Sequence, residues 1–264
     1  MFFMGRSIWN YREFILGSVK REFQSKYQNS ILGGAWAVLH PMAMILVYTV
    51  IFSQVMKTRL PHADSSYAYS IYLCAGMLTW GLFAEIVGRG QNLFIDNANL
   101  LKKISFPRVT LPVILILNAC INFAIIFGLF LAFLFLTGHW PGWTLLNLLP
   151  LLGIQLLLAT GLAMVLGVVN VFFRDVGQFF AIFLQFWFWV TPIVYPAVVL
   201  PAQIAHMQAY NPMYPLVNAY QSVLMGQPVA DWLALKVPLI LGILLCLLGW
   251  RMFRRHVGEM VDEL

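Results

Sequence analysis

The sequence predicts an all-α membrane protein with six transmembrane helices in a single domain that covers residues 1–264. Three observations predict this fold class. Hydrophobic residues make up 61% of the chain, charged residues only 10%, and the mean hydropathy is +0.81. An ordinary soluble domain carries about 25% charged residues. A soluble protein of this length could not cover its surface with so few charges, so a polytopic membrane protein is expected.

Six segments contain the roughly 20 mostly apolar residues that a membrane-crossing helix requires. The predicted spans are residues 35–56, 69–88, 109–136, 143–172, 178–196 and 236–253. The third and fourth exceed the minimum, which indicates tilt or an extension beyond the lipid. No cleavable signal peptide is expected, because the first apolar span begins behind a charged stretch.

The distribution of lysine and arginine predicts the orientation of these spans. With a cytoplasmic N-terminus, 13 of the 16 basic residues fall in inside segments, and 3 (Lys57, Arg59 and Lys236) fall outside. This bias follows the positive-inside rule and places both termini in the cytoplasm. The net charge of +6 therefore indicates orientation in a cytoplasmic membrane and contact with anionic lipids, and we expect no nucleic-acid partner.

The leader at residues 6–27 is predicted to form an amphipathic helix that lies in the cytoplasmic membrane interface. Its apolar residues recur every four positions, and basic residues occupy the other faces. The apolar positions are Tyr11, Ile15, Val19, Phe23 and Tyr27. A merely solvated leader is the alternative, and Gly17 in the middle of the helix weakens the prediction slightly.

The inside loop 89–108 carries a second amphipathic pattern. Apolar residues recur at roughly helical spacing among polar ones, namely Leu93, Phe94, Leu100, Leu101 and Ile104. A helix that ends before Pro107 would offer a docking surface to a soluble partner. A helix that simply lies on lipid fits the pattern equally well.

The outer stretch 197–235 is apolar, and prolines interrupt it. Pro201 suits the first turn of one short helix that ends at Asn211, and Pro215 suits the start of a second that ends at Gly226. Neither is long enough to cross the bilayer. Apolar helices of this kind must pack on protein or line a cavity. The sequence therefore favours a lid that covers an exit rather than a free loop.

Signatures of catalysis are absent from the sequence. No glycine is followed by lysine, which excludes a phosphate-binding Walker loop, and the five histidines show no metal-binding spacing. Glu85 is the one clear intramembrane acid, and Arg89 lies four residues later, which predicts a helix-surface ion pair. Asn118 and Asn122 are expected to bond neighbouring helices, and the small-residue stripe Ala159, Ala163 and Gly167 indicates close helix packing.

Aromatic residues are concentrated in the fifth predicted span. Phe183, Phe186 and Trp187 lie toward its middle, beyond the interfacial belt in which such residues are common. Aromatic rings stack on sugar rings, and tryptophan adds a hydrogen-bond donor. A sugar-lined pore is one interpretation, and ordinary helix packing is the other.

Four short motifs, in this order along a six-span chain, resemble a known family. They are Ser30-Ile31-Leu32-Gly33-Gly34-Ala35-Trp36 leading to Pro41, Asn170-Val171-Phe172-Phe173-Arg174-Asp175, Thr191-Pro192-Ile193-Val194-Tyr195-Pro196, and Asn211-Pro212. The chain resembles, over nearly its whole length, the membrane subunit of ABC-2 type polysaccharide exporters. Its character is closest to that of O-antigen permeases, although capsule exporters share much of it.

The resemblance implies a homodimer that works with two separate ATP-binding subunits and moves a polysaccharide on a polyprenyl diphosphate anchor. ATP and magnesium would bind to those subunits, and this chain would hold no cofactor and would not be an enzyme. The loop around residues 93–103 would be the coupling helix that docks on the ATPase. Its candidate residues are Leu93, Phe94, Asp96, Asn97, Leu100, Lys102 and Lys103.

Three further groups of candidate residues follow from the resemblance and from residue chemistry. The lipid-diphosphate would be met by Lys20, Arg21, Lys26, Leu32, Gly33 and Arg174. Spans one and five would line the channel with Tyr48, Phe52, Phe183, Phe186, Trp187 and Tyr195. The two short helices between spans five and six would form an outer gate with Met207, Tyr210, Tyr214 and Tyr220.

Three other functions remain open at this stage. An ABC-2 permease for drugs or small lipids would share the topology but tolerate a narrower, less aromatic channel. An intramembrane acyl or glycosyl transferase should show an acid or histidine cluster at one membrane face, which the sequence lacks. A secondary transporter is disfavoured, because a proton relay would normally show several acids within the spans, where only Glu85 is clear, and obvious inverted halves are missing.

Overall fold

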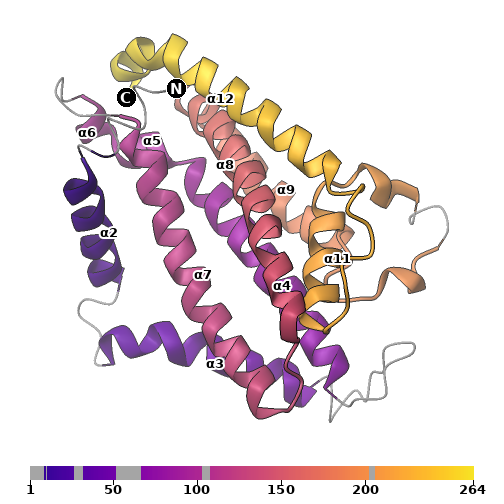
Figure 1. The fold of residues 1–264 in the computed structure, drawn as a ribbon. Coiled ribbons are helices and arrows are strands. Elements are labelled where there is room, and N and C mark those ends of the chain that lie inside the picture. The colour runs from indigo at the N-terminus through magenta and orange to yellow at the C-terminus, as the bar shows by residue number, and fades with distance from the viewer. Residues whose placement is uncertain (1–8, 10, 27–31, 52–66, 103–107, 202–205) are drawn as a thin grey trace.

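The computed structural model describes residues 9, 11–26, 32–51, 67–102, 108–201 and 206–264, and the following account is confined to them. Every regular element in these ranges is helical (Figure 1). The longer elements are α2 (Arg12–Lys26), α3 (Trp36–Thr49), α4 (Ala68–Gly90), α7 (Thr110–Leu136), α8 (Leu148–Phe172), α9 (Asp175–Val190), α11 (Met213–Leu224) and α12 (Lys236–Glu263). The short ones are α5 (Leu93–Asp96), α6 (Ala98–Leu101), η1 (Gly33–Ala35), η3 (Gly142–Asn147), η4 (Ala197–Val199) and η5 (Gln208–Tyr210).

Four helices are long and apolar enough to cross a membrane. They are α4, α7, the continuous helix Gly142–Phe172 that joins η3 to α8, and α12. These four confirm the predicted second, third, fourth and sixth spans. The last helix extends ten residues beyond the predicted end at 253, to Glu263, because Phe253 and Met260 are buried against the rest of the chain.

The other two predicted spans coincide with shorter apolar helices. The helix Gly33–Thr49 covers most of the first, and residues 52–56 lie outside the described ranges. For the fifth span, the predicted end at 196 was wrong, because α9 ends at Val190. Thr191 precedes a proline and adopts an extended conformation with ψ 130°, as the steric restriction at such positions requires. At about 1.5 Å per residue, the 16 residues of α9 extend about 24 Å.

The helices α4, α7, α8 and α12 run side by side, whereas α3 lies across the lower ends of α7 and α4 (Figure 1). Tight backbone contacts hold α8 and α12 together. A Cβ atom on Gly161 would lie 2.7 Å from the backbone nitrogen of Cys246, and one on Gly242 would lie 2.9 Å from that of Leu158. Small residues at helix contacts are typical of membrane proteins, where close packing replaces hydrophobic burial as the driving force.

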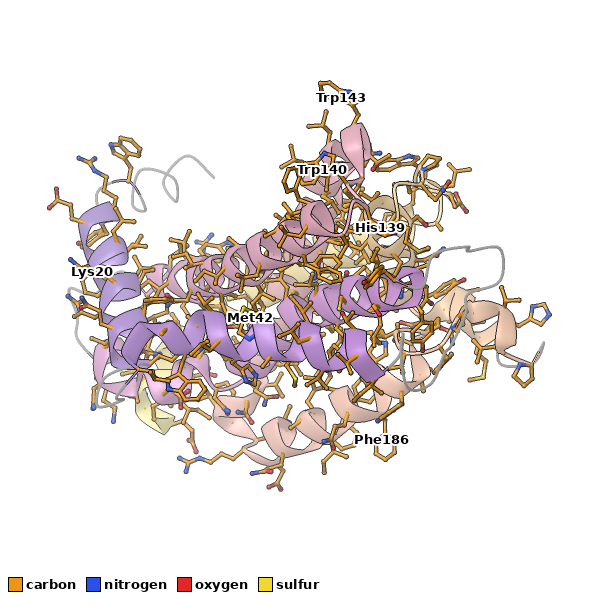
Figure 2. The ribbon with its side chains drawn as sticks, turned by 90° about the horizontal axis from the view of Figure 1, so that it is seen from below. Lys20, Met42, His139, Trp140, Trp143 and Phe186 are labelled. Atoms are coloured by element: carbon orange, nitrogen blue, oxygen red, sulfur yellow. The ribbon has the colours of Figure 1, made fainter. Side chains whose placement is uncertain are left out.

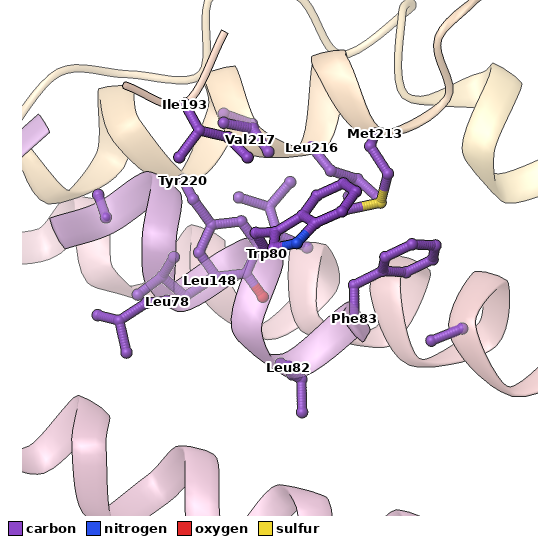
Figure 3. Close-up of a cluster of buried hydrophobic side chains, with 14 of the residues drawn as sticks. Leu78, Trp80, Leu82, Phe83, Leu148, Ile193, Met213, Leu216, Val217 and Tyr220 are labelled. Atoms are coloured by element: carbon purple, nitrogen blue, oxygen red, sulfur yellow. The ribbon is translucent and has the colours of Figure 1, made fainter. Parts of the chain in front are cut away.

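The main apolar core lies between α4, α8 and α11. Figure 3 shows Trp80 and Phe83 of α4 packed against Met213, Leu216 and Tyr220 of α11. Of the four long apolar helices, α4 is the most buried. In α4, 67% of the residues of the apolar stretch are buried within the structure, compared with 17% in α7 and 22% in α12. The helix α4 therefore forms the centre of the described part of the chain, while α7 and α12 expose apolar surface.

Candidate functional site

The predicted amphipathic helix of the inside loop was wrong as a single helix. The structure has two one-turn helices there, α5 and α6, separated at Asn97 with φ −111° and ψ 24°. The side-chain nitrogen of Asn97 donates a hydrogen bond to the carbonyl of Leu93 at 2.8 Å. Such local bonds compete with helix propagation, which explains the break. Lys103 and Ile104 lie outside the described residues.

We call residues 91–102 the α5–α6 segment. Its apolar side is covered by the same chain, because Phe94 and Leu101 are each only 1% exposed and pack with residues of α8 and α12. The ring of Phe94 stacks on that of Phe253 with centroids 5.1 Å apart. Leu93, Asn97 and Leu100 are half-buried, and the exposed residues are Asp96, Asn99 and Lys102. The surface that this segment offers to a partner is therefore polar.

The C-terminal end of α4 packs very closely against α8. A Cβ atom on Gly90 would lie 2.4 Å from the Cβ of Ala163, and one on Gly167 would lie 2.7 Å from the Gly90 carbonyl. Ala159 is fully buried in the same stripe. The close packing predicted from the small-residue stripe is confirmed, and it fixes the start of the α5–α6 segment against α8.

Asn170, near the end of α8, joins three elements at this same place. Its side-chain nitrogen donates to the carbonyl of Gln91 at 2.9 Å and to the side-chain oxygen of Asn92 at 3.0 Å. Its side-chain oxygen accepts a hydrogen bond from the backbone nitrogen of Gly177 at 2.7 Å, in the first turn of α9. Asn170 was noted in the sequence only as part of a motif, and its bonding role was not predicted.

A polar cluster links α2, α4 and α7 below the α5–α6 segment. Arg89 lies 3.5 Å from Glu85, which confirms the predicted ion pair, and it also pairs with Glu22 of α2. Asn118 donates to Glu22, and Asn122 donates to Glu85 at 2.7 Å, so both asparagines bond neighbouring helices as predicted. The participation of Glu22 was missed, because no local spacing relates the leader to the second span.

Two open cavities meet at this cluster. One, of about 280 Å³, is polar and is lined from α2, α4 and α7. The other, of about 300 Å³, is largely apolar and lies between α3, α4 and α7, with Tyr48 in its wall. Both cavities are lined by Glu85 and Asn122. The structure therefore places Tyr48 in an apolar groove within one chain, while Phe52 lies outside the described residues.

The predicted channel aromatics of α9 divide into two groups. Phe183 is 41% exposed and Phe186 is 67% exposed, and Figure 2 shows Phe186 pointing away from the bundle. Trp187 instead packs inward against Trp80 and Phe83 of α4. Its indole nitrogen donates to Asn211 at 2.8 Å. Trp187 thus attaches α9 to the core.

The exposed face of α9 carries residues that sequence reasoning missed. Phe179 and Trp189 are exposed on the same face as Phe186. Gln178 and Gln185 are also exposed, seven residues apart and therefore two turns apart along one edge of this face. Exposed glutamines were detectable in the sequence as the two polar side chains of an otherwise apolar stretch. Aromatic rings beside amide groups form a surface that suits sugars.

The segment after α9, residues 191–195, bends repeatedly and is held by tyrosines of α4. Tyr72 donates to the carbonyls of Pro192 at 3.2 Å and Tyr195 at 3.1 Å, and Tyr69 donates to the carbonyl of Val194. The hydroxyl of the half-buried Tyr195 donates to the carbonyl of Trp189 at 2.5 Å. The residues of this segment thus follow α4 instead of continuing α9.

The four predicted gate residues do not share one environment. Met207 is 64% exposed and Tyr210 is 87% exposed, whereas Tyr214 is half-buried. Tyr220 is buried in the main core, and this burial raises the pKa of its phenol. Of the two predicted short helices, the second is observed as α11, but it begins at Met213, before Pro215. Its predicted stop, Gly226, follows with φ +77°. The first predicted helix lies partly outside the described residues, at 202–205; of its described residues, 206 and 207 are α-helical and continue into η5.

The predicted diphosphate-binding residues lie on three separate elements. Lys20, Arg21 and Lys26 are exposed on α2, whose Ile15 and Val19 pack on α7. The predicted leader helix is thus confirmed over Arg12–Lys26, and Figure 2 shows Lys20 directed away from the bundle. The turn at Leu32 and Gly33 is observed, with φ +49° at Gly33. Arg174 is exposed at the N-terminus of α9.

Comparison with known proteins matches this architecture to one family. The family described as ABC-2 type transporter matches residues 14–225, from α2 to the end of α11. The O-antigen export system permease protein RfbA of Myxococcus xanthus is 31% identical over 86% of this chain and 85% of its own length. RfbA of Klebsiella pneumoniae is 26% identical over 89% of this chain and 88% of its own. The polysialic acid transport protein KpsM of Escherichia coli is 19% identical over 92% and 93%.

Proposed function

The chain belongs to the ABC-2 type transporter family, and on this premise we propose that it is the permease subunit of an ATP-driven exporter of lipid-linked polysaccharide. The expected cargo is an O-antigen-like chain that crosses the cytoplasmic membrane. One observation carries the proposal: the similarity to O-antigen export permeases extends over 86–89% of this chain. It therefore includes the α5–α6 segment and α9, the regions that an exporter of this kind would use.

The energy for export would come from a separate subunit. The chain has no glycine followed by lysine and hence no Walker loop, so we propose two ATP-binding partners that hold ATP and magnesium. The exposed polar residues Asp96, Asn99 and Lys102 would meet such a partner. We propose that the α5–α6 end of the bundle and both termini face the cytoplasm. This orientation agrees with the basic residues Arg251, Arg254 and Arg255 on the last turns of α12.

We further propose that two copies of the chain form the transport path, with α3 and α9 as short first and fifth spans. The exposed face of α9 supports this arrangement. An amide side chain that faces lipid hydrocarbon lacks hydrogen-bond partners and is costly. Gln178 and Gln185 would be satisfied if this face lines an aqueous path in which sugar hydroxyls pass. Phe179, Phe183 and Phe186 beside them would stack weakly on passing sugars, which suits processive movement.

The negatively charged diphosphate would be attracted to the basic residues at the cytoplasmic end. Lys20, Arg21 and Lys26 are each exposed on α2, and Arg174 is exposed at the start of α9. Charge-assisted hydrogen bonds from such groups to phosphate oxygens are strong. The turn at Leu32 and Gly33 would border the same entrance. At the opposite end, the exposed Met207 and Tyr210 with the half-buried Tyr214 would form the gate around α11.

A deletion strain tests the function. Cells that lack this chain but retain glycan synthesis should lose surface polysaccharide and accumulate finished lipid-linked glycan on the cytoplasmic face. Restoring the chain should restore surface glycan, whereas restoring it with an ATPase partner that cannot hydrolyse ATP should not. Undiminished surface polysaccharide in the deletion strain would contradict the proposal, and a defect in drug or phospholipid export with normal glycan would favour the other ABC-2 cargo class.

A further inference from the structure

We infer that Asn170 is a positioning residue that makes the α5–α6 segment and the first turn of α9 move as one body. The inference rests on the proposed function, in which a partner ATPase displaces the α5–α6 segment and α9 lines the path of the glycan. We call the hydrogen-bonded contact of Asn170 with Gln91, Asn92 and Gly177 the Asn170 joint. Through this joint, a displacement of the α5–α6 segment would be transmitted to α9.

The carboxamide of Asn170 is fully engaged in this joint. Both donor positions of its nitrogen are used, by the Gln91 carbonyl at 2.9 Å and the Asn92 side chain at 3.0 Å. Its oxygen accepts from the backbone nitrogen of Gly177 at 2.7 Å. The residue is only 1% exposed. If the α5–α6 segment slid relative to α9, buried donors and acceptors would be left unpaired, which costs more than the bonds themselves contribute.

The space around the carboxamide leaves little freedom for such sliding. A Cβ atom at Gly177 would lie 2.9 Å from both the side-chain oxygen and the side-chain nitrogen of Asn170. One turn earlier on α8, a Cβ at Gly167 would lie 3.2 Å from the ring of Phe94 and 2.7 Å from the Gly90 carbonyl. Packed interfaces of this density move as rigid units or adopt a different discrete arrangement, and they do not deform continuously.

The attachment matters because α9 has few other anchors. Only Gly177 and Leu184 of its 16 residues are buried. Its other described polar attachments include the bond from Trp187 to Asn211 and the bond from Gln208 to the Val190 carbonyl, both at the opposite end. At the α5–α6 end, the position of α9 is therefore set by the Asn170 joint, by the packing of Val176 on the main core, and by the direct connection to α8 through Phe173 and Arg174.

The test uses the complete exporter, with its ATPase partner, reconstituted in lipid vesicles that contain lipid-linked glycan. Two quantities are measured in parallel, ATP hydrolysed and glycan exported. Asn170→Ala removes the three bonds, and Gln155→Ala is its matched control. Gln155 is also a buried carboxamide on α8, but it bonds the Thr79 carbonyl at 2.7 Å in the middle of α4. Glycan exported per ATP should fall about tenfold for Asn170→Ala, within the usual range of coupling effects, and less than twofold for Gln155→Ala.

A second pair of variants perturbs the joint without removing Asn170. Gly177→Ala places a methyl group against the carboxamide, and Gly88→Ala is the control, because a Cβ at Gly88 has nothing within 4 Å. Gly177→Ala should reduce export per ATP, and its effect should shrink when it is combined with Asn170→Ala, since the clashing group is then absent. This pair also keeps the inference testable if Asn170→Ala does not fold.

A distance measurement reads the joint directly. Spin labels on Asn99→Cys and Asp175→Cys, with the native cysteines replaced, report the separation of α6 and the start of α9. The separation should be the same with and without ATP on the partner, and it should become broad or nucleotide-dependent with Asn170→Ala. A nucleotide-dependent separation in the otherwise unaltered chain, or unchanged coupling in both Asn170→Ala and Gly177→Ala, would overturn the inference. Absence of glycan export by the unaltered complex would instead contradict the proposed function.

Discussion

At one end of α4, Gly90 lies directly against Ala163 of α8, and Arg89 pairs with Glu85 and with Glu22 of α2. At the other end, Tyr69 and Tyr72 reach across to backbone carbonyls of the non-helical segment after α9. The same helix is thus held by backbone packing and charge at its α5–α6 end, and by phenol hydroxyls at its far end.

The two ends of α4 therefore differ in how readily their contacts can change. Packing without room for a methyl group has no alternative arrangement at low cost. A tyrosine hydroxyl, in contrast, rotates and finds another acceptor, and the hydroxyl of Tyr72 already has two carbonyls within reach, those of Pro192 and Tyr195. We therefore expect substitutions at the α5–α6 end to destabilise the fold, and substitutions at the far end mainly to release one segment.

The largest effect is expected at Gly90. Gly90→Ala inserts a Cβ 2.4 Å from that of Ala163, so α4 and α8 must separate. Overpacking of this kind costs about 3 kcal/mol, which should lower the thermal unfolding midpoint of the detergent-solubilised protein by several degrees. Gly81→Ala is the control, because a Cβ there meets nothing within 4 Å. Equal stability of the two variants would show that the contact between α4 and α8 at Gly90 is not tightly packed.

The next effect is expected at Arg89. Arg89→Ala leaves the carboxylates of Glu22 and Glu85 without the cation they share. Because these side chains are partly exposed, we expect a loss of about 1–2 kcal/mol. Combining Arg89→Ala with Glu22→Gln should recover part of this loss in a double-mutant cycle. Strictly additive losses would mean that α2 is not held by this pair.

A smaller effect is expected at the far end of α4. Tyr72→Phe removes the donor to the carbonyls of Pro192 and Tyr195 and should cost about 1 kcal/mol. Hydrogen exchange of the amides between Ile193 and Tyr195 should accelerate, while exchange in α4 itself stays unchanged. Tyr67→Phe, which alters a hydroxyl five residues earlier in the chain, is the comparison variant. Equal protection of the segment in both variants would argue against the role of Tyr72.

The sequence was sufficient for contacts set by local spacing. The Glu85–Arg89 pair is four residues apart, and the stripe that includes Ala163 and Gly167 repeats every four residues, so helical geometry alone predicted both. Four spans followed from length and apolarity. Each of these predictions needed only the period of a helix.

Contacts between distant segments were not predictable in the same way. Glu22 and Arg89 are 67 residues apart, and Asn170 and Gln91 are 79 apart. Nothing in a single sequence relates such positions, because helix rotation and tilt depend on packing. Local competition caused the other failures: the bond of Asn97 to Leu93 divided the predicted coupling helix, and Pro192 ended α9 early.

The smallest effect on stability, and the sharpest test of the α5–α6 end, is expected at Lys102. Its side chain is exposed, so Lys102→Ala should change the free energy of unfolding by less than about 0.5 kcal/mol. If the polar side of the α5–α6 segment meets the ATPase, the same variant should weaken co-purification of the partner, most clearly at high ionic strength where remaining charge contacts are screened. Lys236→Ala, which alters a lysine at the start of α12, is the control. Loss of the partner without loss of stability would separate docking from folding, which Gly90→Ala cannot do. Full retention of the partner by Lys102→Ala combined with Asp96→Asn would mean that the partner docks elsewhere.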